Sequence, residues 1–245
     1  MPNWCTNNVT LSGERVPELL KDLQAPLRLI KQEPGNWEIV ESADGEEQKP
    51  YSYFFYRVKH VLDSEWVPGY MSNVEHIGSK WGVCDPTVTP EDDDHVHIHF
   101  SSAWGPCVRG FLRIAKHYKL DMEYDYEECG NDISGDLVYS AKDNTVQYWQ
   151  GSYAVGRVRE DAPSWEQNAE RLKDAIGEFF TIELDSWDSS DVIDSREALR
   201  KALEEKEECP QAQKFYLNQW EELGKITLED VRRKSCTFEE ALGVF

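Results

Sequence analysis

The stretch EDDDHVHIHF at residues 91–100 decides the fold, because apolar and imidazole side chains alternate along it. Residues i and i+2 of a strand lie on the same face of a sheet. One face of this strand therefore carries Val96, Ile98 and Phe100, and the opposite face carries three histidines. The stretch LDMEYDYE at residues 120–127 alternates in the same way, with an acidic residue at every second position. Both stretches are predicted to be strands with one buried face.

Working outward, residues 108–118 place apolar side chains at helical spacing, so a helix is expected between the two strands. Residues 8–11 predict an earlier strand, residues 17–30 a helix, and residues 136–140 and 146–149 a late hairpin. This order predicts an α+β fold, a ferredoxin-like split βαβ sandwich. We expect the helices to cover one face of the sheet and the other face to stay open or meet a partner.

Pro26 falls inside the helix expected at residues 17–30 and predicts a kink or a break there. Residues 33–50 are rich in Gly, Pro, Glu and Ser, which favours a loop. Residues 72–80 predict a short helix that leads into Trp81 and Gly82.

The pattern of residue types changes after Arg157, where acidic and amphipathic helical patterns begin. Helices are predicted at residues 195–208, 215–223 and 228–234. Thr237 and Glu240 have the spacing of a capping box and predict one more short helix. We therefore expect a ferredoxin-like α+β domain at residues 1–157 and an added acidic helical C-terminal region at residues 158–245.

Composition narrows the classes of partner. The chain has 245 residues, 40% of them hydrophobic, and a formal net charge of -21. Such a field repels nucleic acid, and it suits a partner with a basic surface, a metal ion or simple solubility. The sequence contains no Cys-x-x-Cys motif and no apolar stretch of the roughly 20 residues that a membrane span needs. We expect free thiols, a cytosolic location, no direct nucleic-acid binding and no membrane insertion.

Four short motifs indicate a relationship: NWCTNNVT at residues 3–10, GSKW at 78–81, SAWGP at 102–106, and EECG at 127–130, followed by Gly135. Together they resemble the YubB-like ferredoxin-fold family, whose members occur in phages, plasmids and genomic islands. This chain departs from that pattern at Ile77, where the family usually has Trp, and at Cys107, where it often has a second Pro. The resemblance implies a ferredoxin-like fold and a mobile-element origin, and it brings no catalytic residue.

The histidine row is the sharpest chemical candidate in the sequence. Alternation places His95, His97 and His99 on one sheet face, and successive histidines in this row are about 6.5–7 Å apart. Two of them can converge on one zinc ion, and a carboxylate such as Glu123 would complete the site if its strand lies alongside. Those carboxylates would then raise the imidazole pKa values. The alternative is a polar outer face without a metal.

The tryptophans divide into two groups. Trp37 and Trp66 lie in loop-like sequence and are predicted interface residues, since Trp is over-represented at binding hot spots. Trp81 and Trp104 flank turns and are predicted to fill the core, although together with Trp4, Trp37, Trp66 and Trp149 they could instead form a recognition surface.

The C-terminal region supplies a row of acidic candidates for binding, as an imitation of a phosphate array or as a solvated helix surface. They are Asp185, Asp188, Asp191, Asp194, Glu204, Glu205, Glu207 and Glu208.

Catalytic motifs are absent from the sequence. There is no G-x-S-x-G and no phosphate-binding glycine loop. Cys107 precedes a predicted helix, a position that can lower a thiol pKa, but His117 lies too far along that helix to act as its base. Our first hypothesis is a mobile-element accessory protein without a cofactor that binds and inhibits a host protein. The alternative is a metal-dependent enzyme, or a sensor of a small ligand or nucleotide, with zinc on the histidine face.

Overall fold

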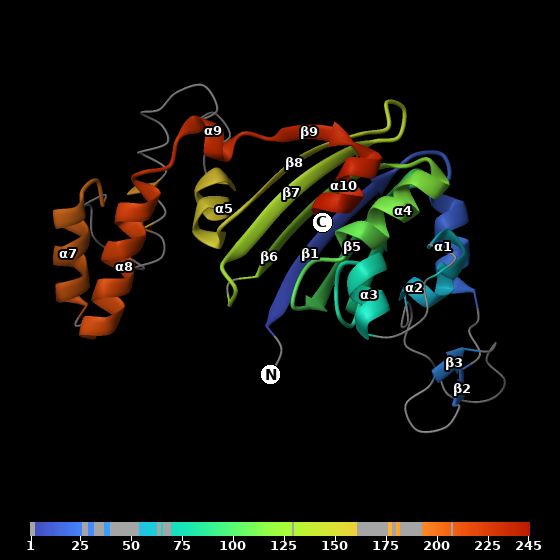
Figure 1. The fold of residues 1–245 in the computed structure, drawn as a ribbon, viewed down its shortest axis with the longest axis horizontal. Helices are drawn as coiled ribbons and strands as arrows, with labels where there is room; N and C mark the ends of the chain where they lie inside the picture. The colour runs from blue at the N-terminus through green and yellow to red at the C-terminus, as the bar shows by residue number, and fades with distance from the viewer. Residues whose placement is uncertain are drawn as a thin grey trace. The chain divides into compact units, whose positions relative to one another are not determined.

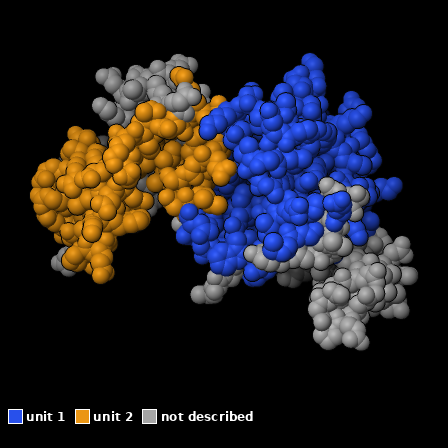
Figure 2. All heavy atoms as spheres, viewed as in Figure 1, with its two compact units in different colours: residues 1–131, 135–148, 234–245 blue, residues 132–134, 149–233 orange. Residues whose placement is uncertain are grey.

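The computed structural model gives the fold of most of the chain (Figure 1). The residues it describes are 3–25, 29–31, 37–39, 54–62, 65, 70–128, 130–160, 176–177, 180–181, 193–206 and 208–245. They divide into two compact units (Figure 2). Unit 1 comprises residues 1–131, 135–148 and 234–245, and unit 2 comprises residues 132–134 and 149–233.

A seven-stranded sheet is the centre of the fold, with strand order β4-β5-β1-β6-β7-β8-β9. Its strands are β1 (Trp4–Ser12), β4 (Cys84–Pro90), β5 (His95–Ala103), β6 (Asp121–Glu128), β7 (Ile133–Ser140), β8 (Thr145–Gly151) and β9 (Lys234–Thr237). Strand β1 pairs antiparallel with both β5 and β6. The alternating stretches at residues 91–100 and 120–127 therefore do form strands, and the helix α4 (Val108–Tyr118) joins them as predicted.

The topology is a pair of interleaved βαβ units. Strand β1 leads through the helix α1 (Val16–Gln24) to β4, and β5 lies between β1 and β4. Strand β5 leads through α4 to β6, and β1 lies between those two. This is the split βαβ arrangement of a ferredoxin-like fold. The predicted α+β class is confirmed.

One face of the sheet is covered by α1, α4 and α10 (Phe238–Val244), as Figure 1 shows. Phe111 of α4 stacks on Phe100 at a ring-centroid distance of 5.2 Å and meets the edge of Tyr124 at 5.7 Å. The short helices α2 (Phe54–Arg57), η1 (Lys59–Val61) and α3 (Tyr70–His76) add to this layer. The apolar positions of the alternating strands are buried beneath it.

A buried polar network links the strands under this layer. The Asn7 side chain is fully buried, and its Nδ2 donates to Ser102 Oγ and to Cys5 O, both at 2.9 Å. Its Oδ1 accepts a hydrogen bond of 2.7 Å from the Tyr124 hydroxyl. Tyr124 in turn accepts from Cys107 N at 2.9 Å. Because these polar groups satisfy one another, the network specifies how β1, β5 and β6 fit together.

The same region explains three of the short sequence motifs. Trp104 N donates to Asn3 O at 3.0 Å, and Ser79 Oγ donates to Ala103 O at 3.0 Å. Gly78 has a φ of +102°, and a Cβ placed there would lie 2.7 Å from Pro106 O. The motif residues therefore meet at one end of the sheet and form its structural corner.

Two expectations about the N-terminal half are wrong in part, namely the helix to residue 30 and the loop at residues 33–50, and one strand is not predicted. The helix α1 ends at Gln24, before Pro26, and residues Leu29–Lys31 form the strand β2 instead of a helical end. Strand β3 (Trp37–Ile39) pairs with β2, although residues 33–50 are predicted as loop. Strand β4 is missing from the sequence prediction altogether. Its sequence CDPTVTP contains two prolines, and a proline argues against a strand because it cannot donate a backbone hydrogen bond to the sheet.

Unit 2 contains the helices α5 (Tyr153–Glu160), α7 (Arg196–Glu205), α8 (Pro210–Leu223) and α9 (Leu228–Val231). Ser195 caps α7 by accepting from Ala198 N, in agreement with the predicted helix start. Phe180 and Trp220 pack together in a small separate core. Helices therefore dominate the described part of this unit, as predicted.

The last residues return to the sheet of unit 1. Residues 234–237 form β9, which pairs antiparallel with β8, and Phe238 of α10 packs on Tyr139 at 5.7 Å. The helix expected at residues 228–234 stops at Val231 instead. Thr237 and Glu240 form the predicted capping box at the start of α10. The units thus separate between residues 148 and 149, and residues 234–245 belong with the sheet, which differs from the expected boundary at 157/158.

Candidate functional site

The second face of the sheet in unit 1 is lined by polar side chains. We call it the open face and define it by the outward positions of β1, β5 and β6. These positions are Trp4, Thr6, Asn8, Thr10, Ser12, His95, His97, His99, Ser101, Asp121, Glu123, Asp125 and Glu127. All are partly or fully exposed, and the residues between them along each strand are buried, save at the edges. None of the thirteen is a lysine or an arginine.

Strand register arranges these side chains in rows. His99 lies opposite Asn8, which lies opposite Asp125. His99 Nδ1 is 2.7 Å from Asn8 Oδ1, and Asn8 Nδ2 donates to Asp125 Oδ1 at 2.8 Å. The Asn8 amide therefore bridges an imidazole and a carboxylate on neighbouring strands. In the next row His97 Nδ1 is 3.3 Å from Thr10 Oγ1.

The predicted convergence of the histidines with Glu123 does not occur. Strand β1 separates the histidine strand from the acidic strand, so Thr10 lies between His97 and Glu123. Adjacent strands are about 4.8 Å apart, which puts these two residues roughly 10 Å apart across the sheet. A zinc ligand set of His95, His97, His99 and Glu123 is not assembled on this face, because the ligand atoms that lie close together among the described residues are those of Asp92, Asp94 and His95.

His95 has acidic partners of its own, from the turn before its strand. Its Nδ1 is 2.9 Å from Asp92 Oδ1 and 2.7 Å from Asp94 Oδ1. Hydrogen bonds to Asp92 and Asp94 raise the pKa of His95 above its ordinary value. Ligand atoms of these three residues lie within 4.8 Å of one another, so among the described residues they form the group that could hold a metal ion. Asp92 and Asp94 are exposed on the turn, and His95 is partly exposed at the start of β5.

Asp125 of the acidic strand has a shifted pKa. Partial desolvation by its neighbours raises this pKa above the ordinary value, although the residue lies on the surface. The hydrogen bond from Asn8 and the nearby His97 oppose the shift. The Asn8 bridge thus stabilises the charged form of a carboxylate that its surroundings disfavour.

A pair of exposed tryptophans borders the open face. Trp4 begins β1, and its ring centroid is 5.7 Å from that of Trp81, with the planes at 61°. Trp4 is 47% exposed and Trp81 49% exposed. Lys80 Nζ lies 5.8 Å from the centre of the Trp81 ring. Large aromatic rings left half in water on a sheet of this size are typical of binding surfaces.

The prediction that Trp81 and Trp104 fill the core is therefore wrong. Trp104 is 48% exposed, and its positive φ of 70° places it in the corner where the motifs meet. The interface residues predicted instead cannot be placed. The side chain of Trp37 and the whole of Trp66 lie outside the described residues.

The acidic residues of the C-terminal region are only partly described. Asp185, Asp188, Asp191 and Glu207 lie outside the described residues. Asp194 is exposed, and Glu208 is half-buried. Glu204 and Glu205, both exposed on α7, form ion pairs with Arg200 and Lys201 of the same helix. These two pairings within the helix reduce the negative field of α7, which weakens the idea of a phosphate-like array there.

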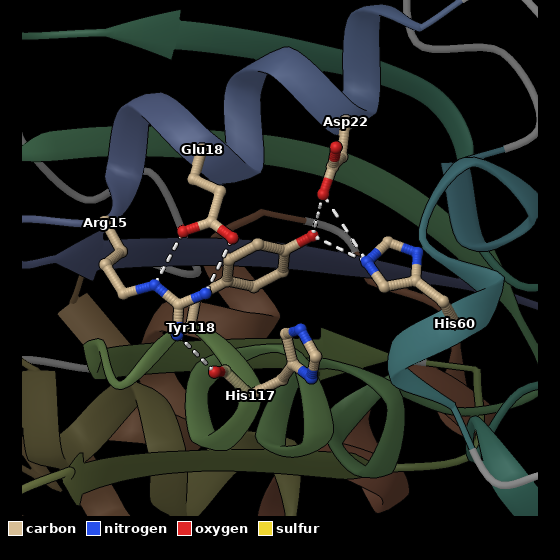
Figure 3. A network of polar contacts seen from close by, with 6 residues as sticks. All are labelled: Arg15, Glu18, Asp22, His60, His117 and Tyr118. Atoms are coloured by element: carbon tan, nitrogen blue, oxygen red, sulfur yellow. Dashed lines mark hydrogen bonds and ion pairs between the residues drawn. The ribbon is translucent and has the colours of Figure 1, made fainter.

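A second polar cluster, absent from the sequence prediction, ties three elements of the helical layer together (Figure 3). The Tyr118 hydroxyl donates to Asp22 Oδ2 at 2.5 Å and lies 3.2 Å from His60 Nε2. Arg15 Nη1 donates to the carbonyl of His117 at 2.8 Å, and the same guanidinium pairs with Glu18 at 2.7 Å. The helical spacing of residues 15, 18 and 22 is the signal that would have revealed this cluster.

The chemistry of this cluster is structural. Asp22 and His60 both engage the Tyr118 hydroxyl, so that hydroxyl is not directed at a substrate. Burial, followed by the hydrogen bond to Asp22, raises the Tyr118 pKa. Desolvation and the neighbouring His60 and Arg15 lower the pKa of His117. The cluster fastens α1, η1 and α4, and it makes that junction sensitive to acid.

Cys107 does not behave as an activated thiol. It is fully buried at the start of α4, and desolvation raises its pKa well above the ordinary value. Burial likewise raises the pKa of the neighbouring Cys5 to about 12. A thiolate nucleophile needs the opposite shift, so neither cysteine is placed for catalysis.

A family model agrees with the ferredoxin-like fold. Residues 85–172 match the model of a family described as the ferredoxin-like domain in Api92-like protein. The crystal structure of a protein Api92 from Yersinia pseudotuberculosis is similar over 62% of this chain and 98% of that chain, with 11% identity and a TM-score of 0.35. No curated protein matches the chain. None of the helices within the described ranges has the length and apolar character to cross a membrane.

Proposed function

We propose that this chain is an accessory protein of a mobile genetic element, related to the YubB-like family, that binds a host protein and inhibits it. The contact surface is the open face of unit 1, and the partner is a cytosolic protein with a basic surface. The proposal involves no cofactor and no reaction centre.

One observation carries the proposal: an exposed tryptophan pair adjoins an uncompensated row of carboxylates on a single sheet face. Trp4 is followed along β1 by Thr6, which lies opposite Glu127 of the acidic strand. Aromatic rings supply contact area, and carboxylates without neighbouring cations select a positive partner. The short motifs at the corner of the sheet support the mobile-element origin through their resemblance to the YubB-like family.

The experiment is capture of a partner by variants of the open face. Immobilised wild-type protein is compared with Glu123→Gln/Asp125→Asn and with Trp4→Ala, in lysate of a bacterial host at low and high salt. A charge-matched control, Glu204→Gln/Glu205→Gln, removes two acids from α7 instead. We expect one stoichiometric partner that the wild type and the α7 control retain, that both face variants lose, and that salt releases.

The captured partner is then purified and its own activity is measured with and without added protein. A decrease that the wild type causes and the face variants do not cause supports inhibition. If the α7 control loses the partner and the face variants retain it, the contact surface lies in the C-terminal region instead. Absence of any stoichiometric partner at low salt would refute the proposal.

A metal-dependent function is the second candidate, and it rests on the cluster of Asp92, Asp94 and His95. Titration of purified protein with zinc, followed by calorimetry, tests it. Binding that His95→Ala abolishes and His99→Ala preserves would favour a metal site at the turn. Zinc binding that is absent, or that survives His95→Ala, would remove this candidate.

A further inference from the structure

The spacing of charges on the open face describes its occupant more closely. The acidic strand presents four outward carboxylates, Asp121, Glu123, Asp125 and Glu127, which we call the acidic stripe. Successive residues of the stripe are two positions apart in the sequence, so their Cα atoms are roughly 6.5–7 Å apart. The side chains of an extended peptide that face one way have the same repeat. A cationic strand laid along β6 would therefore match the stripe charge for charge.

The strands on either side of the stripe offer it no cation on this face, since the outward residues of β7 are Ser134, Asp136, Val138 and Ser140. The stripe's neighbours on β1 are Ser12, Thr10, Asn8 and Thr6, which are neutral. The imidazoles lie one strand further away, on β5. Like charges in a row on a sheet repel one another, and a cationic partner relieves that repulsion. Charge complementarity therefore selects lysine or arginine for the positions that contact the stripe.

The tryptophan pair defines one end of the same track. Trp4 shares the face of Thr6, and Thr6 lies opposite Glu127, so the pair stands beyond the last carboxylate. Lys80 already places a positive charge over the Trp81 ring. A second cation is disfavoured there, whereas an apolar side chain against Trp4 would bury surface on both sides.

We infer that the occupant of the open face is an extended segment of the partner, with lysine or arginine at alternate positions along the acidic stripe and an apolar side chain against Trp4. This inference rests on the proposed function and specifies the partner's chemistry. It differs from a globular basic surface, whose charges have no fixed repeat.

Two synthetic peptides test the repeat. The first alternates lysine and threonine and has a leucine at each end, so that it fits in either direction. The second has the same composition, with the lysines gathered in one block. Both carry fluorescein, and anisotropy gives their affinity for the full-length protein at low salt. We expect the alternating peptide to bind about fivefold more tightly, because only its charges meet each carboxylate at short range.

Variants locate the binding. Glu123→Gln/Asp125→Asn should weaken the alternating peptide about fivefold, and Glu204→Gln/Glu205→Gln should leave its affinity unchanged. Trp4→Ala should remove the advantage of a peptide with terminal leucines over one with terminal serines. Circular dichroism of each variant checks that the sheet is intact.

Equal binding of the two peptides would overturn the inference, and so would an unchanged affinity in the face variant. Neither result would decide the proposed function, which depends on capture of the intact partner by the open face. Conversely, tight and register-dependent peptide binding with no captured partner would sustain the binding chemistry and refute inhibition of a host protein.

Discussion

Replacement of Asn7 by alanine tests whether the buried network holds the sheet together. Asn7 is fully buried in β1, and its amide connects three partners: Ser102, Cys5 and Tyr124. Asn8, the next residue, points to the open face and bonds to His99 and Asp125 there. The chain thus offers the same side chain at adjacent positions, once inside the core and once at the surface.

The size of the effect follows from the groups that lose a partner. Alanine would leave the buried Tyr124 hydroxyl without its acceptor, a penalty of about 1–3 kcal/mol. Loss of the two amide hydrogen bonds at 2.9 Å, to Ser102 and Cys5, adds about 0.5–1.5 kcal/mol each. We expect Asn7→Ala to lower the free energy of unfolding by about 3–5 kcal/mol. Asn8→Ala should cost about 1 kcal/mol or less, since its partners regain water.

Urea denaturation followed by circular dichroism measures both changes. The comparison is valid where the dependence on urea is the same for all variants. Tyr124→Phe supplies a further control, because it removes the hydroxyl that Asn7→Ala leaves stranded. In that background Asn7→Ala should cost at least 1 kcal/mol less than in the wild type. Equal costs for Asn7→Ala and Asn8→Ala, or no coupling to Tyr124, would refute the reasoning.

Three further results are expected. Phe238→Ala should destabilise the protein by about 3–5 kcal/mol in urea melts, because Phe238 is buried against Tyr139. The control Phe215→Ala, at an exposed position of α8, should cost about 0.5 kcal/mol or less. Equal effects would show that residues 234–245 do not complete the sheet. Gly78→Ala should cost at least about 1–3 kcal/mol, because φ is +102° and Pro106 O blocks a Cβ, whereas Gly243→Ala in α10 meets nothing within 4 Å and should be neutral or stabilising. The pKa of His117 is lower in the folded protein than in the unfolded chain, so protonation of His117 destabilises the fold. The contribution of neutral His117 to stability is present above the unfolded pKa of about 6.5 and is lost as the pH falls through the folded pKa. His117→Gln should therefore lose less stability than the wild type between about pH 7 and about pH 5, and an identical pH dependence would contradict the shift.

Local periodicity was enough to predict the elements with strong alternation. Strands β5 and β6 and the helix α4 have apolar residues at the period of their structure, so the sequence locates them closely. Strands β4 and β9 are short and polar, and pairing with a neighbour stabilises them more than their own pattern does. The pattern of a single sequence does not show which segments pair, so it predicts neither of these strands.

Exposure of aromatic residues was harder to predict than their presence. Trp81 and Trp104 were assigned to the core because large rings near turns commonly fill it. Their exposure depends on the corner built by Gly78, Asn3 and Ser79, whose contacts join segments far apart in the sequence. Hydrophobicity gives the tendency of a ring to be buried, but the tertiary contacts determine whether other residues are placed to bury it.

The error about the metal site shows how topology constrains chemistry. A split βαβ unit requires one strand between the two that its helix joins, and α4 joins the histidine strand to the acidic strand. The predicted fold therefore already placed a strand between the strands of His97 and Glu123. The intervening strand is β1, whose Asn7 and Asn8 point in opposite directions. One asparagine fixes the three strands from within, and the other bridges His99 to Asp125 outside, so the same register that stabilises the core spaces the charges that a partner would meet.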